Sequence, residues 1–87
     1  MRVKEKMTGL FALPKEIALN LPLLTLTGHN EINIENYKNL IEFTESIIRV
    51  QTNAGMLHIE GHSLTLKQVT SEHLLITGKI KAVSWLG

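Results

Sequence analysis

The stretch from Thr52 to Gly78, TNAGMLHIEGHSLTLKQVTSEHLLITG, constrains the fold of this chain more than any other part of the sequence. Apolar and polar residues alternate in short runs here, and the glycines at positions 55, 61 and 78 separate those runs. A period of two residues places alternate side chains on opposite faces of a strand, one buried and one solvated. Glycine between such runs is typical of turns, because it tolerates a positive φ. The stretch therefore predicts strands joined by turns, and nothing in it resembles a catalytic centre.

The same period of two continues on both sides of this stretch, from Leu23 to the end of the chain. In EINIEN, for example, Ile32 and Ile34 share one face and the polar residues occupy the other. Gly61 and His62 are expected to form a turn between two strands, and Gly78 is expected to end another strand. We therefore expect about eight short strands, within residues 23–27, 31–36, 40–44, 47–52, 55–61, 63–69, 73–78 and 79–86.

The connections between these strands are too short to hold crossover helices, which favours antiparallel pairing between neighbours. The fold class predicted is all-β, a small sandwich or partly closed barrel, with a short β-solenoid as the alternative. We expect each outer strand to be covered by the N-terminal segment or paired with a second copy, because unpaired strands invite association. The predicted core comprises Ile32, Ile34, Ile41, Phe43, Ile48, Val50, Leu57, Ile59, Leu64, Leu66, Ile76, Ile80, Val83 and Trp85.

The first 22 residues differ from the rest in their periodicity. The apolar residues Val3, Met7, Leu10 and Phe11 fall on one face of a helix, and basic and acidic residues occupy much of the remainder. The sequence predicts an amphipathic helical leader over residues 1–22 and a single β domain over residues 23–87. An isolated helix of this length is marginal, so the leader needs a surface to lie on. That surface is the protein's own sheet, a partner, or a membrane interface, which basic amphipathic segments also suit.

Composition limits the functions open to the chain. Its 87 residues, 44% hydrophobic and 20% charged, predict one folded domain without a membrane-spanning segment. The absence of cysteine excludes disulfides and thiolate chemistry. A formal charge of +1 and few aromatic residues argue against nucleic-acid binding, which needs a basic surface and bases stacked on rings. A modest basic patch formed by Lys67, Lys79 and Lys81 is more typical of a protected strand edge.

One group of residues has the composition of a metal site. His58, Glu60 and His62 alternate along a strand, so all three would lie on the same face, and zinc accepts imidazole and carboxylate ligands. A further histidine would have to come from His29 or His73. The alternative is a polar, solvent-facing strand surface without metal. No nucleophile elbow or phosphate-binding loop is present, so the sequence predicts no catalytic residue and no cofactor.

An ordered set of short segments covers nearly the whole sequence. The segments are LPKE at 13–16, PLLTLTG at 22–28, IEN at 34–36, G-x-L-x-I-x-G at 55–61 and ITGKI at 76–80. In these segments the chain resembles the YabP/YqfC family of sporulation proteins from endospore-forming bacteria, and within it the YqfC branch. Tyr37, which follows the Glu-Asn pair, departs from the polar or basic residue that is frequent there in the family.

This resemblance implies a β fold and a non-enzymatic role in spore formation, and it carries over no catalytic or binding residue. Combined with the leader, the resemblance predicts an interaction or scaffold protein. Such a protein would self-associate or dock on another sporulation protein, for example one bound to a membrane. The expected location is the cytoplasm, at the periphery of a membrane of the sporulating cell. The interaction surface predicted is the leader face of Val3, Met7, Leu10 and Phe11. The alternative function is a small ligand-binding or metal-binding β domain that uses His58, Glu60 and His62.

Overall fold

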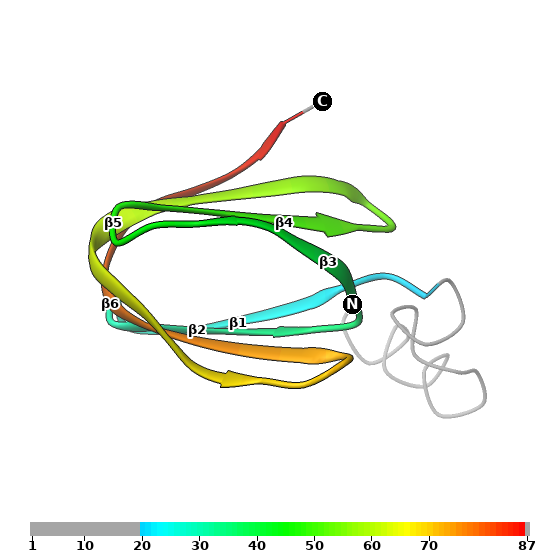
Figure 1. Ribbon diagram of the computed structural model, residues 1–87, viewed down its shortest axis with the longest axis horizontal. Coiled ribbons are helices and arrows are strands. Elements are labelled where there is room, and N and C mark those ends of the chain that lie inside the picture. The colour runs from blue at the N-terminus through cyan, green and yellow to red at the C-terminus, as the bar shows by residue number, and fades with distance from the viewer. Residues whose placement is uncertain (1–19, 87) are drawn as a thin grey trace, which may run out of the picture.

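The computed structural model describes residues 20–86, which form one antiparallel sheet of six strands (Figure 1). The order of strands across the sheet is β1-β2-β6-β5-β4-β3, so β1 and β3 are its outer strands. No helix long and apolar enough to cross a membrane occurs within these residues. The strands are β1 Leu23–Thr27, β2 Glu31–Glu35, β3 Tyr37–Phe43, β4 Ile47–Thr52, β5 Gly55–Val69 and β6 His73–Leu86.

The sheet is folded over so that two layers face each other, and the long strands β5 and β6 run through both (Figure 1). In one layer, residues 55–60 of β5 lie between β4 and the end of β6. In the other layer, residues 73–77 of β6 lie between β2 and the end of β5. Each layer therefore contains half of β5 and half of β6, and the core lies between the layers.

The predicted count of eight strands is wrong, because Gly61 and Gly78 lie inside continuous strands rather than between strands. Both glycines sit where β5 and β6 bend together, next to irregularities in the strand register. A Cβ atom on Gly61 would lie 2.1 Å from the carbonyl oxygen of Lys79, and Gly78 has a φ of +134°. The glycines therefore allow two paired backbones to bend at close range, which is a different use of glycine from a chain-reversing turn.

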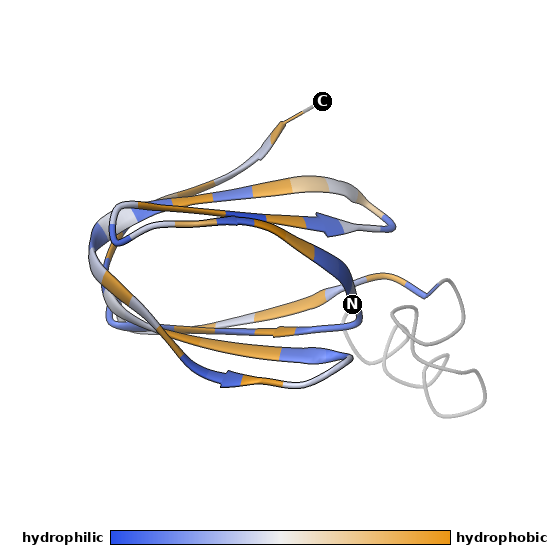
Figure 2. Ribbon diagram, in the orientation of Figure 1, coloured by the Kyte–Doolittle hydropathy of each residue, from blue (hydrophilic) through white to orange (hydrophobic). Residues whose placement is uncertain are grey.

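The core between the layers consists of alternate residues from four strands, as the banding in Figure 2 illustrates. The predicted inward faces of β2 and β4 and of the first half of β5 are confirmed. Leu24, Tyr37, Leu40, Leu66 and Val83 pack around this core and are partly buried. The buried hydrophobic residues are Ile32, Ile34, Ile48, Val50, Leu57, Ile59, Leu64, Leu74, Ile76 and Ile80.

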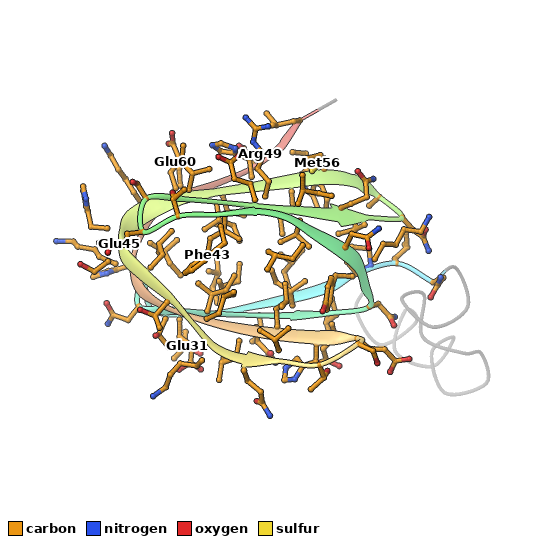
Figure 3. All side chains as sticks on the ribbon, in the orientation of Figure 1. Glu31, Phe43, Glu45, Arg49, Met56 and Glu60 are labelled. Atoms are coloured by element: carbon orange, nitrogen blue, oxygen red, sulfur yellow. The ribbon has the colours of Figure 1, made fainter. Side chains whose placement is uncertain are left out.

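Three residues predicted to be buried are exposed: Ile41, Phe43 and Trp85. Ile41 lies at a register irregularity of β3 between Leu40 and Glu42, which interrupts the alternation. Phe43 is paired with the buried Ile48 and is drawn between the layers in Figure 3, but β3 is an outer strand and leaves its ring half open to solvent. Trp85 is exposed because this end of β6 is paired with β5 alone.

The predicted all-β class and antiparallel pairing are confirmed. The solenoid alternative is wrong, because solenoid coils stack their strands in parallel and every pairing observed is antiparallel. The predicted helical leader lies outside the described residues, except for its last three. Of these, the carbonyl oxygens of Asn20 and Leu21 accept hydrogen bonds from the side chains of Asn53 and Asn36, at 2.9 and 3.1 Å.

Thr52, the last residue of β4, is the single buried polar residue of the described chain and is 2% exposed. Its hydroxyl group accepts a hydrogen bond from the backbone N–H of Ala54 at 3.0 Å and donates one to the carbonyl oxygen of Gly55 at 2.8 Å. Replacing Thr52 with valine keeps the shape and removes both bonds. We expect this change to lower the free energy of unfolding by about 1–3 kcal/mol in urea titrations. Thr25→Val, at an exposed position of β1, is the matched control and should cost much less.

Candidate interaction surface

The large hydrophobic side chains exposed on the described surface all lie on strand segments that are paired on one side only. β1 and β3 are the outer strands of the sheet. Within residues 20–86, residues 65–69 of β5 have no strand partner opposite β6, and the last residues of β6 have none opposite β5. These exposed residues are Leu23 and Leu26 on β1, Ile41 and Phe43 on β3, Val69 on β5, and Trp85 and Leu86 on β6.

Two of these four edges carry features that hinder pairing with another strand. β3 contains Lys38 and Glu42 and has two irregularities in its register with β4. The second half of β5 contains Lys67 and has a register irregularity between Leu66 and Gln68. Charged residues and bulges are the usual means by which proteins prevent strand edges from associating. These two edges are therefore poor candidates for an interaction surface.

The other two edges carry no charge at all. They are β1, with the sequence LLTLT, and residues 82–86 of β6, with the sequence AVSWL. Their register with β2 and with β5 is regular along each segment. We call these two segments the uncharged edges. Within residues 20–86 neither segment pairs with a strand on its outer side, and both carry apolar side chains, so they have what is needed to accept a further strand.

The apolar residues on the core side of the uncharged edges extend the core toward solvent. Leu26 is paired with Ile32, and Trp85 with Leu57; both partners are completely buried. Residues directly opposite each other in a sheet share a face, so Leu26 and Trp85 also face the core. Even so, Leu26 is 53% exposed and Trp85 is 46% exposed. The core is therefore open to solvent along these edges.

The outward face of β3, β4 and the first half of β5 is polar and carries a short row of charges. Arg49 Nε lies 3.2 Å from an oxygen of Glu42, its cross-strand neighbour on β3. On the other side of Arg49, His58 Nε2 lies 3.8 Å from an oxygen of Glu60. Figure 3 shows Arg49 and Glu60 pointing away from the space between the layers. The Arg49 and Glu42 side chains are 43% and 40% exposed, and ion pairs of this exposure contribute little to stability.

The predicted metal-ligand set is only partly brought together. His58 and Glu60 are neighbours, whereas His62 lies at the bend and lines a pocket with His29. His73 lies elsewhere, with its Nε2 hydrogen-bonded to the side-chain oxygen of Asn33. Within residues 20–86, no three His, Asp or Glu side chains are grouped so that they could hold a metal ion. The predicted leader face of Val3, Met7, Leu10 and Phe11 lies outside the described residues.

The sequence did not predict that Leu26 and Trp85 are exposed. It does contain one indication of the uncharged edges, namely their lack of charged residues. Among the six strands, β1 contains no charged residue, and β6 contains none after Lys81. The remaining four strands all contain lysine, arginine or glutamate. Absence of charge alone does not distinguish an edge from a buried central strand, so the pairing order was needed to interpret it.

Comparison with known proteins agrees with the resemblance drawn from the short segments. The chain is 29% identical to the uncharacterized protein YqfC of Bacillus subtilis (strain 168) over 85 residues, which is 98% of this chain and 91% of that protein. That alignment extends into the segment that precedes residue 20. Residues 20–87, which contain all six strands, match the YabP family. The chain therefore belongs to the YabP family.

Proposed function

We propose that this protein is a non-enzymatic interaction module that acts during sporulation by pairing its uncharged edges with another strand. The partner strand belongs to a second copy or to another sporulation protein. The observation that carries this proposal is a combination found at β1 and at residues 82–86: no strand partner on the outer side within residues 20–86, exposed apolar side chains, and no charge. Strand addition at such an edge supplies main-chain hydrogen bonds, and the alternate side chains supply specificity.

The role in sporulation rests on membership of the YabP family. The relative from Bacillus subtilis is itself uncharacterized, so the mechanism rests on the surface alone. In this proposal the protein works in the cytoplasm at the periphery of a membrane, and its N-terminal segment contributes the apolar residues Val3, Met7, Leu10 and Phe11. A metal-binding role is not proposed, because His58, Glu60 and His62 do not form a three-ligand group.

The decisive change is Leu26→Lys, which places a charge on the core side of β1 at a position that is already 53% exposed. A lysine there opposes strand addition without removing a buried side chain. If the protein self-associates, we expect the change to raise the dimer dissociation constant by about tenfold or more, or ~1.4 kcal/mol. Light scattering coupled to size exclusion, over a wide range of protein concentration, measures this. Ile41→Lys, on the charged edge β3, is the matched control and should leave the mass unchanged.

If the protein is a monomer at every concentration, the hypothesis of self-association is excluded and the hypothesis of docking on another protein remains. In that case the same two variants are compared as fluorescent fusions in sporulating cells. Leu26→Lys should disperse the fusion, and Ile41→Lys should not. A variant without residues 1–13 tests the leader and is expected to keep the β-sheet circular dichroism while losing assembly or localisation. Normal assembly and normal localisation of Leu26→Lys would together contradict the proposal for β1.

A further inference from the structure

A pocket lies at the bend of the sheet. The turn between β1 and β2 contributes His29, the bend of β5 contributes His62, and the adjoining part of β6 contributes Lys79, Ile80 and Lys81. These five residues line the pocket, which has a volume of about 420 Å³. No residue of the uncharged edges takes part. The pocket is therefore a separate feature of the surface.

The backbone fixes these residues around the pocket. The N–H of Ile80 donates a hydrogen bond to the carbonyl oxygen of His29 at 2.7 Å, and the N–H of Gly78 donates one to that of Asn30 at 3.1 Å. These bonds fasten the β1–β2 turn onto β6. His62 is directly opposite Lys79 in the register of β5 with β6. His29 and His62 thus come from two different loops or bends and are held against the same short segment of β6.

All ionisable side chains that line the pocket are bases. His29, His62, Lys79 and Lys81 surround it, and no carboxylate lines it. Within residues 20–86 Arg49 forms an ion pair with Glu42, and His58 lies near Glu60; neither contact involves these four side chains. Bases placed directly opposite each other in a sheet repel when both are charged. No acidic side chain offsets the positive charge of this cluster, and a bound anion would do so.

Ile80, the one apolar side chain that lines the pocket, is a buried residue of the core. Lysine side chains cover apolar surface with their methylene groups while they hold the ammonium group outward. Ammonium groups are three-fold donors and imidazole rings supply further N–H donors, which suits an acceptor with several oxygens. We propose that this pocket binds a phosphate group, either free phosphate or the phosphate of an anionic lipid headgroup.

The test follows the backbone amide resonances of Lys79, Ile80 and Lys81, and the ring resonances of His29 and His62, in the full chain by NMR. Inorganic phosphate is added at constant pH and ionic strength, and saturable shifts confined to these residues are expected. The double variant Lys79→Gln/Lys81→Gln should weaken binding by about fivefold or more, because two of the donors are lost. Lys38→Gln/Lys67→Gln removes the same charge outside the pocket and should bind as the unaltered protein does.

Co-sedimentation with vesicles distinguishes the two sources of phosphate. Retention on phosphatidylglycerol vesicles, but not on phosphatidylcholine vesicles, with loss in the pocket variant alone, assigns the site to an anionic headgroup. Saturation by inorganic phosphate without vesicle retention assigns it to free phosphate. The proposal is overturned if neither probe gives saturable binding, or if both double variants weaken binding equally. These variants leave β1 and residues 82–86 unchanged, so the result is independent of the proposed edge interaction.

Discussion

Gly78→Ala is expected to lower the free energy of unfolding by about 3 kcal/mol or more, which is a large part of the stability of a domain of this size. Gly78 has a φ of +134°, in a region that residues with a Cβ atom rarely adopt. An added Cβ would also lie 2.6 Å from the carbonyl oxygen of Ser63 and 2.9 Å from the Cα of Leu64. Both contacts are with backbone on the paired strand, so a rotamer change cannot relieve them.

The measurement is urea unfolding followed by circular dichroism, with Gly28→Ala as the matched control. Gly28 also has a positive φ, +57°, but a Cβ there would meet nothing within 4 Å. Its replacement should therefore cost about 1–2 kcal/mol, the penalty of the left-handed backbone alone. Gly61→Ala should behave like Gly78→Ala, since its Cβ would lie 2.1 Å from the carbonyl oxygen of Lys79. Equal, small losses for Gly28→Ala and Gly78→Ala would contradict a tightly packed bend.

The bend also explains which part of the fold the sequence could predict. Alternation identified the inner faces of β2, β4 and the first half of β5, because those segments are paired on both sides and regular. It could not distinguish a glycine in a turn from a glycine in a bent strand, since both interrupt a run of alternating residues. The sequence therefore predicts a turn at Gly61 and a strand end at Gly78, whereas both lie inside continuous strands. Their role depends on close backbone contacts across the β5–β6 pair, Gly61 with Lys79 and Gly78 with Ser63, which alternation along the sequence does not reveal.

The candidate sites depend on pairing in the same way. Leu26 and Trp85 have the periodicity of core residues, and only the strand order shows that their segments lie at edges. His62 was grouped with His58 and Glu60 because the three alternate along one strand. The bend instead places His62 beside His29, which is 33 positions earlier in the sequence, and against Lys79. Spacing along one strand could not predict a group assembled from three elements.

Ile48→Ala is expected to be the most costly of the simple core truncations on β4, with a loss of about 3–4 kcal/mol in the free energy of unfolding. Ile48 is completely buried and lies between Phe43 on β3 and Ile59 on β5. Truncation to alanine removes buried methyl and methylene groups and leaves a cavity that two flanking strands hold open. Urea unfolding of the variant measures the loss. Ile48→Val, which removes one methylene group, should cost about 0.5–1.5 kcal/mol and remains measurable if the alanine variant does not fold.

Ile41→Ala is the matched control, because the sequence predicts that Ile41 and Ile48 are both buried in the core. Ile41 is 51% exposed, at the register irregularity of the outer strand β3. Truncation there creates no cavity, so the loss should stay below about 1 kcal/mol, mostly from the lower strand preference of alanine. A loss at Ile41 equal to that at Ile48 would mean that Ile41 is covered in solution. Since the strand β3 has a free edge, such a result would place a partner or a second copy on the charged edge and would argue against β1 as the principal interaction surface.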